Sequence, residues 1–242
     1  MKRMGVQENK KGGVTPAVGL KLPGVSVMLA GPWALIALAV LLALFVAIVY
    51  LIVAKTGPPV WASAGLWVLF IAYWSAAAKN AAPTKSSESV ASRQLHQLLM
   101  YGALLLALLP VPGLRLRWLP DAPWIEVPVG LAVQVGSALL AVWARRHLGR
   151  NWSGAITSVV GHQLVRTGPY RLIRHPIYSG MLGMFLGTAV VSGELHALVA
   201  FVIIAAAYWR KIRLEEAHLR NVFGAEYEEY RKKSWALIPM LL

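Results

Sequence analysis

The sequence contains no cysteine and little charge. The absence of cysteine excludes a disulfide framework, a cysteine-ligated metal centre and a thiolate nucleophile. Only 14% of the 242 residues are charged, and acidic residues are the scarcer sign, with 10 Asp and Glu against 24 Lys and Arg. A soluble domain usually carries about 25% charged residues. Because 57% of the residues are hydrophobic, the composition argues against both a soluble globular domain and a disordered chain.

Long uncharged runs predict a helical membrane protein. Four runs have lengths within the range of about 17–25 residues that crosses a bilayer. Two shorter runs, separated by three residues, predict a helical hairpin whose full crossing the sequence leaves open. We expect an all-α integral-membrane helical bundle of about six spans, the last two a short hairpin, with a cytoplasmic C-terminal helix. The runs are 32–54, 60–78, 98–114, 127–144, 176–191 and 195–209.

The basic residues predict the orientation of the spans. With six spans and a cytoplasmic N-terminus, only Lys55, Arg115 and Arg117 fall on the opposite side of the membrane. The positive-inside rule then predicts that both termini are cytoplasmic, in a bacterial inner membrane or an endoplasmic reticulum membrane. Because this topology accounts for the net charge of +14, we expect no nucleic-acid partner.

A polar segment between the fourth and fifth spans leads into a helix start. It ends in the run Arg174-His175-Pro176-Ile-Tyr178-Ser-Gly180. Pro176 suits the first turn of a helix, where its missing N–H costs nothing. The unpaired amides of that turn can bind an anion, and Arg174 adds positive charge there. The glycines at 180, 183 and 187 would let either a neighbouring helix or a ligand approach closely.

A second polar segment, after the sixth span, contains the pair Glu215-Glu216. Helical spacing matches these acids with Lys211, Arg213 and Arg220, which is typical of a solvated, ion-paired helix. The same carboxylates, beside the mouth of a membrane bundle, would alternatively bind hydroxyls or a cation. The chain has no P-loop, no nucleotide-binding Gly-x-Gly-x-x-Gly and no His-Glu-x-x-His, and we expect no metal.

Together these runs resemble the isoprenylcysteine carboxyl methyltransferase family. The resemblance covers about 40% of the chain, from Arg145 to the C-terminus, and the segment 148–154 looks like the bacterial branch. Arg-His-Pro-x-Tyr-x-Gly also occurs in phospholipid N-methyltransferase-like proteins, and a similar run occurs in membrane sterol reductases. The motifs are Gly168-Pro-Tyr170, Arg174 to Gly180, Glu215-Glu216, and Phe223-Gly224 with Tyr227, Tyr230 and Ile238-Pro239.

The resemblance implies transfer of a methyl group from S-adenosylmethionine to a lipid-like or prenylated acceptor, at a carboxylate, beside membrane lipids. Composition and the apolar runs predict a flexible basic tail (1–31) and four transmembrane helices (32–144), and the resemblance implies a cofactor-binding catalytic region (145–242). Either Arg210 or Arg213 would lie near the acceptor carboxylate, and Glu215 would be the base for an amine acceptor. The implied cofactor cradle is His162, Leu164, Val165, Gly168, Tyr170, Arg174, His175, Pro176, Tyr178, Ser179, Glu215 and Glu216.

Two other functions remain open on sequence. The first is a membrane reductase that acts on an isoprenoid or sterol with NADPH, and the double glutamate weighs against it. The second is a transporter or structural membrane protein, which predicts no cofactor binding. Transporters often carry a charged residue well inside a span, and this sequence shows none there.

Overall fold

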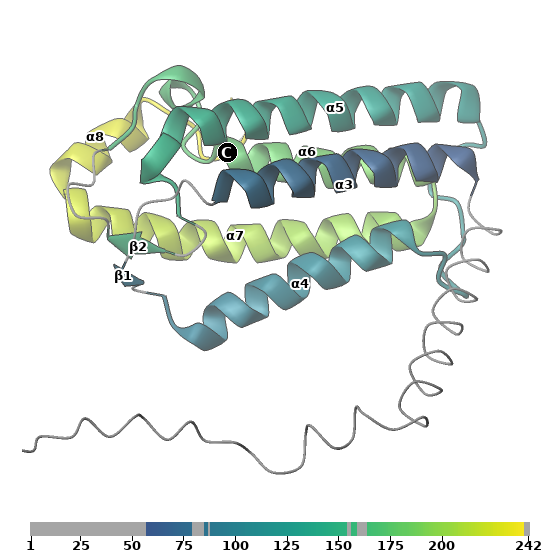
Figure 1. The fold of residues 1–242 in the computed structure, drawn as a ribbon, viewed down its shortest axis with the longest axis horizontal. Helices are drawn as coiled ribbons and strands as arrows, with labels where there is room; N and C mark the ends of the chain where they lie inside the picture. The colour runs from purple at the N-terminus through teal and green to yellow at the C-terminus, as the bar shows by residue number, and fades with distance from the viewer. Residues whose placement is uncertain (1–56, 79–84, 87, 154–155, 159–163, 240–242) are drawn as a thin grey trace, which may run out of the picture. The chain divides into compact units, whose positions relative to one another are not determined.

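Five long α-helices make up most of the residues that the computed structural model describes, which are 57–78, 85–86, 88–153, 156–158 and 164–239 (Figure 1). A short C-terminal helix follows them, and the expected all-α fold is confirmed. The only strands in these residues are two residues long and pair antiparallel, β1 (Lys85–Ser86) with β2 (Thr157–Ser158). The helices are α3 (Pro58–Ala78), α4 (Val90–Leu108), α5 (Pro123–Leu148), α6 (Pro176–Ser192), α7 (Leu195–Phe223) and α8 (Ala225–Lys232).

Three of the described helices, α3, α5 and α7, are long and apolar enough to cross a membrane. Their length and composition identify the chain as an integral membrane protein. The helix α6 is apolar but shorter, with 17 residues. The tail 1–31 and the first expected span, 32–54, lie outside the described residues. The count of six spans, the orientation of the termini and the domain division therefore stay predictions.

The third expected span begins earlier than its apolar run. The run covers 98–114, whereas the helix α4 covers Val90–Leu108. It begins there because the Ser89 side chain accepts a hydrogen bond from the Ser92 amide and so caps the first turn. It ends there because Pro110 restricts Leu109 to the extended conformation in which it is found.

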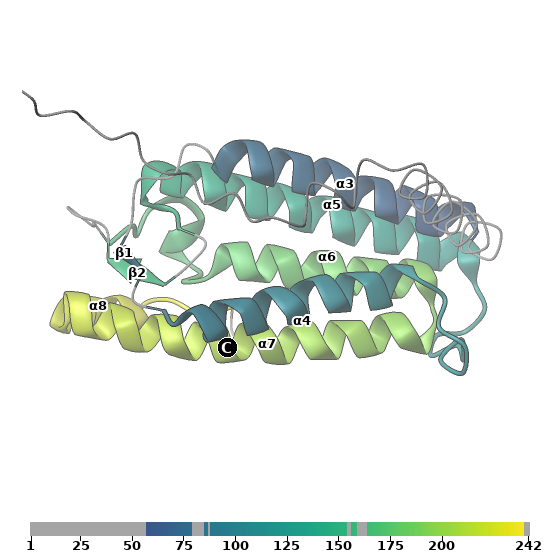
Figure 2. The same cartoon turned by 60° about the horizontal axis from the view of Figure 1, so that its bottom comes forward.

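The helix α6 lies at the centre of the bundle. It contacts α3, α4, α5 and α7, and Figure 2 shows it between α5 and α7. Its contact with α5 is the most extensive between any two described elements. A Cβ atom added at Gly180 would lie 2.6 Å from the Ser137 carbonyl oxygen, and one at Gly187 would lie 2.6 Å from that of Gly130. The glycines therefore allow close helix packing, which was the first of the two interpretations open on sequence.

The expected hairpin of α6 and α7 is confirmed, but its second arm is longer than expected. The chain reverses at Gly193, whose φ of 61° lies in the left-handed region that glycine adopts without strain. The α7 helix then continues without a break from Leu195 to Phe223. Its apolar part ends at Trp209. The polar remainder extends the same helix beyond the span, so Glu215 and Glu216 are held rigidly relative to the bundle.

Candidate active site

A cavity of about 490 Å³ lies where the start of α6, the polar part of α7 and the start of α8 converge. Small-molecule sites usually have volumes of about 300–1,000 Å³. Residues of α3, α4 and 148–153 together with Ile156 also line it, among them Trp74 and Trp152, whose rings meet edge to face with centroids 5.6 Å apart. Seven of the expected cofactor residues line it: Leu164, Val165, Tyr170, Arg174, His175, Tyr178 and Glu215.

The other expected site residues lie elsewhere. His162 is outside the described residues. Pro176 is buried as the first residue of α6, as its position in the motif predicts. The Ser179 hydroxyl donates to the carbonyl of Leu237 at 2.5 Å, and so joins α6 to the C-terminal segment. Gly168 has a φ of +60°, and an added Cβ atom would lie 2.7 Å from the His147 ring. That turn starts the short 3₁₀ helix Gly168–Arg171, which carries Tyr170 to the cavity.

Of the two adjacent acids, Glu215 lines the cavity and Glu216 does not. The Glu215 carboxylate accepts a hydrogen bond of 2.7 Å from the Tyr178 hydroxyl, and it lies 3.7 Å from Nδ1 of His175. The rings of His175 and Tyr178 stack with centroids 5.5 Å apart, and both come from the start of α6. The Glu215 side chain is 31% exposed, so its carboxylate is open to a ligand. This geometry fits the hydroxyl-binding interpretation of the motif.

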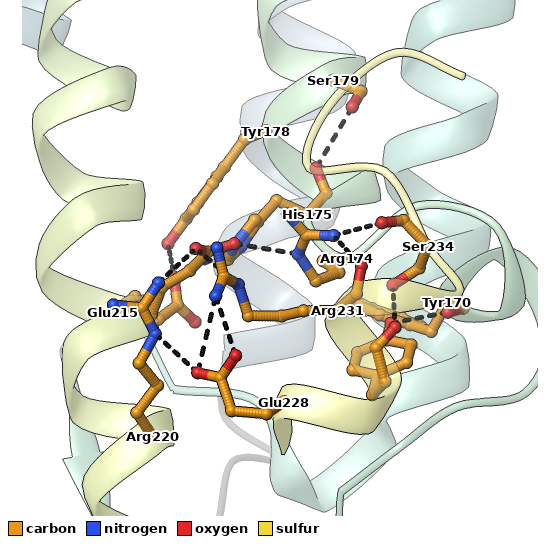
Figure 3. A network of polar contacts seen from close by, with 12 residues as sticks. Tyr170, Arg174, His175, Tyr178, Ser179, Glu215, Arg220, Glu228, Arg231 and Ser234 are labelled. Carbon is orange, nitrogen blue, oxygen red and sulfur yellow. Dashed lines mark hydrogen bonds and ion pairs between the residues drawn. The ribbon is translucent and has the colours of Figure 1, made fainter. Parts of the chain in front are cut away.

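Glu216 faces a different set of partners, of which Arg174, His175 and Arg231 are labelled in Figure 3. Its carboxylate accepts a hydrogen bond of 2.9 Å from Nε of Arg174 and lies 3.4 Å from Nε of Arg231. Nε2 of His175 lies 3.5 Å away. Burial alone would raise the pKa of Glu216, but the hydrogen bonds and charges of His175 and Arg174 outweigh it and lower that pKa to about 2. Glu216 is therefore a buried anion that holds cationic side chains together.

Arg174 joins Glu216 to the C-terminal segment. Its guanidinium donates to the carbonyls of Arg231 and Ser234. Its backbone amide donates to Trp235, and that of His175 donates to Ala236. The Tyr230 hydroxyl completes this wall by donating to the carbonyl of Tyr170 at 2.6 Å. The arginine that was expected to attract an anion is thus largely occupied in closing one wall of the cavity.

Sequence reasoning missed the polar residues that α7 turns toward the cavity. Lys211 and His218 line it together with Glu215, whereas Arg210 and Arg213 do not. Residues 211, 215 and 218 follow the spacing of four and three that marks one face of a helix, so the sequence shows that they share a face but not that this face lines the cavity. Arg210 instead donates to the Ser92 hydroxyl of α4 at 3.0 Å.

Three buried polar atoms of cavity-lining residues make no hydrogen bond within the described part of the chain. One is Nε2 of His175, which lies 3.5 Å from the Glu216 carboxylate, and the other two are Nδ1 of His96 and the hydroxyl of Tyr227. Burial raises the pKa of Tyr227, so its hydroxyl keeps its proton and can donate. Buried polar groups are ordinarily satisfied, and a polar ligand in the cavity would satisfy those of His96 and Tyr227.

Comparisons with known proteins agree with the motif pattern. Residues 125–226 match the family model described as phospholipid methyltransferase. The relatives that match this chain by sequence are named protein-S-isoprenylcysteine O-methyltransferases. The resemblance to the isoprenylcysteine carboxyl methyltransferase family is thereby confirmed.

Two plant relatives illustrate the match. A probable protein-S-isoprenylcysteine O-methyltransferase of Oryza sativa subsp. indica is 35% identical over 121 residues, 49% of this chain and 63% of the relative. Protein-S-isoprenylcysteine O-methyltransferase B of Arabidopsis thaliana is 30% identical over 133 residues, 54% of this chain and 64% of the relative. The chain thus spans less than two thirds of the length of these relatives.

A solved structure of the eukaryotic intramembrane Ras methyltransferase ICMT is also similar. It matches with a TM-score of 0.45 and 19% identity, and the match covers 63% of this chain and 54% of that one.

Proposed function

We propose that the protein is an integral-membrane methyltransferase that uses S-adenosylmethionine and acts on a lipid-like or prenylated acceptor, at a carboxylate. The observation that carries the proposal is the cavity itself. Its wall combines the motif residues His175, Tyr178 and Glu215 with aromatic side chains, next to helices long and apolar enough to span a membrane. A polar cofactor and an amphiphilic acceptor need such a mixed site, and the named relatives are methyltransferases of prenylated cysteine.

The residues of the cavity suit S-adenosylmethionine. Glu215 would accept hydrogen bonds from the ribose hydroxyls, and the unpartnered Tyr227 hydroxyl would donate one to the cofactor. Tyr170, Leu164 and Val165 offer aromatic and apolar walls for the adenine. When bound, this cofactor supplies a methyl group already activated by a positive sulfur, so the protein needs no metal for the transfer. Arg174 and Glu216 would contribute to cofactor binding by holding in place the cavity wall that the C-terminal segment forms.

Lys211 is the cation that we assign to the acceptor carboxylate. It lines the cavity one turn of α7 before Glu215, and its Nζ lies 3.9 Å from Glu88. The Glu88 side chain is 3% exposed. Although burial raises the pKa of Glu88, the hydrogen bond from Ser92 and the charge of Lys211 lower it below its usual value. An ammonium group has three N–H donors, so Lys211 can bind an acceptor while it stays beside Glu88.

These residues would align the acceptor rather than move protons. A carboxylic acid with an ordinary pKa is ionised at neutral pH and needs no base to attack a methyl group. Orientation is then the main contribution of the protein, and Lys211 would direct the acceptor toward the cofactor side of the cavity. The hydrogen bond from Tyr178 fixes the Glu215 carboxylate for the same purpose.

Calorimetric titration of the full-length protein in detergent tests the cofactor assignment. We expect saturable binding of S-adenosylmethionine, no binding of NADPH, and a loss of at least tenfold in affinity in Glu215→Gln because a charge-assisted hydrogen bond is removed. Lys232→Gln, an exposed change on α8, is the matched control and should bind normally. Binding of NADPH alone would indicate a reductase, and binding of neither ligand by folded protein would overturn the proposal.

Transfer of an isotope-labelled methyl group to a farnesylated cysteine tests the acceptor. The labelled product should be an ester, which mild base hydrolyses. An acceptor with a free amine and a blocked carboxylate should receive no label. Labelling of that amine instead would refute methylation at a carboxylate while leaving the cofactor assignment intact.

A further inference from the structure

A second hollow, of about 280 Å³, lies on another face of α7 and shares only Arg174 with the lining of the large cavity. Ile212 forms part of its floor and is 2% exposed. Trp209, where the apolar part of α7 ends, stands in its wall and is 44% exposed. The hollow is lined by Arg174, Trp209, Ile212, Arg213, Glu216, Arg220, Arg231 and Ala236.

Positive charge exceeds negative charge in this hollow. Its lining holds four arginines and one acid, Glu216. Glu228 adds a second acid at the rim, where it lies 3.1 Å from Arg220 and 3.0 Å from Arg231 (Figure 3). The arginines therefore exceed the nearby acids by two. Arg213 is exposed, and its side chain makes no hydrogen bond or ion pair within the described residues. The hollow thus has the charge and the available donor for an anion.

An exposed apolar stripe leads along α7 to the hollow. Val202, Ala206 and Trp209 are exposed, and Arg213 continues their spacing of four, three and four residues. Residues with this spacing lie on one face of a helix. An exposed apolar face on a membrane-spanning helix contacts acyl chains, and tryptophan concentrates at the level of the lipid headgroups. The hollow therefore begins where the headgroup of a lipid beside α7 would lie.

We propose that this hollow binds the phosphate of an anionic phospholipid whose acyl chains lie along the exposed face of α7. Arg213 and Arg220 would contact the phosphate, and Arg174 and Arg231, held by Glu216, would form the inner wall. Basic pockets beside transmembrane helices bind anionic headgroups, and the planar guanidinium matches the geometry of a phosphate. The proposal depends on α7 spanning the membrane and is independent of the reaction in the large cavity.

Lipid titration of the full-length protein, followed by native mass spectrometry, tests the site. The probes are phosphatidylglycerol and phosphatidylcholine with identical acyl chains. Phosphatidylglycerol should bind more tightly, and Arg213→Gln and Arg220→Gln should each weaken it about fivefold, the effect of one arginine near an anionic headgroup. The control Lys232→Gln/Lys233→Gln removes two charges from the end of α8, outside the lining, and should leave the affinity unchanged.

Three outcomes would overturn the proposal. The first is equal affinity for the two lipids, and the second is unchanged affinity for phosphatidylglycerol in Arg213→Gln. Because Arg213 makes no ion pair in the described chain, this variant is expected to fold normally, which a thermal unfolding curve checks. The third is binding of inorganic phosphate that displaces the lipid and depends on the same arginines, since the hollow would then be a site for free phosphate.

Discussion

Replacement of Glu216 by glutamine should destabilise the fold without removing the cofactor site. Glutamine keeps the size of the side chain but loses the charge that neutralises Arg174, whose side chain is only 10% exposed. Removing one partner of a buried ion pair costs about 3–5 kcal/mol, because the other charge stays buried without compensation. Arg174 still donates to the carbonyls of Arg231 and Ser234, so we expect the lower end, about 3 kcal/mol.

The neighbouring change Glu215→Gln is the matched control, because it alters the same side chain type one residue away. Glu215 accepts one hydrogen bond from Tyr178 and is 31% exposed. Because the glutamine oxygen can still accept the bond from Tyr178, the change should cost only about 0.5–1.5 kcal/mol, the order of the difference between a bond to a charged and one to a neutral acceptor. The free energy of unfolding, measured by titration with sodium dodecyl sulfate in mixed micelles, should therefore separate the two variants by more than 1 kcal/mol.

Cofactor titration should rank the same two variants in the opposite order. Glu216→Gln, while folded, should bind S-adenosylmethionine within a few-fold of the wild type, whereas Glu215→Gln should lose most of its affinity. Equal destabilisation by both changes, or stronger loss of binding in Glu216→Gln, would refute the division of roles between the two acids.

Gly180→Ala should destabilise the bundle by about 1–3 kcal/mol, because the added Cβ atom would meet the backbone of α5. Gly136→Ala is the control and should not destabilise it, because no atom lies within 4 Å of its added Cβ. Unfolding titrations compare the two variants. Lys211→Gln should raise the KM for a carboxylate acceptor at least tenfold, measured by steady-state kinetics, and leave the affinity for the cofactor unchanged, measured by calorimetry. An equal loss of acceptor and cofactor binding would contradict the assignment of Lys211 to the acceptor carboxylate. The pKa of Glu216 falls from 4.5 to about 2 on folding, so its ion pair with Arg174 stabilises the fold fully above pH 4.5. This stabilisation is lost as the pH falls from 4.5 toward 2. Over that range the free energy of unfolding should therefore decrease more in the wild type than in Glu216→Gln.

The sequence predicted the helices better than their ends. Apolar run length located α3, α5 and the α6–α7 hairpin because a spanning helix needs an unbroken apolar stretch. It misplaced α4, whose start depends on a serine cap and whose end depends on Pro110. It also stopped the second arm of the hairpin at Trp209, because hydropathy reports where a helix leaves the apolar region and not where its hydrogen bonds end.

Seven of the twelve residues that the resemblance implied for the cofactor cradle line one cavity. The motif did not predict which member of the pair at 215 and 216 faces the cavity, since adjacent helical residues point about 100° apart and either orientation keeps the spacing. The orientation of α7 about its axis is set by burial of Tyr208 and Ile212, which are 3% and 2% exposed. Tertiary packing of this kind leaves no local pattern in a single sequence.

That orientation would also let one helix serve the two proposed ligands, which differ in chemistry. With Tyr208 and Lys211 turned inward, residues at 215 and 218 must follow them into the large cavity, and residues at 209, 213 and 220 must line the hollow on the other face. Arg174 lines both spaces, and Glu216, which accepts its hydrogen bond, lines the hollow. A headgroup bound at Arg213 would therefore lie beside an ion pair whose arginine also lines the large cavity. Anionic lipid should raise the affinity for S-adenosylmethionine in the wild type, and Arg213→Gln should abolish that increase while leaving the affinity in neutral lipid unchanged.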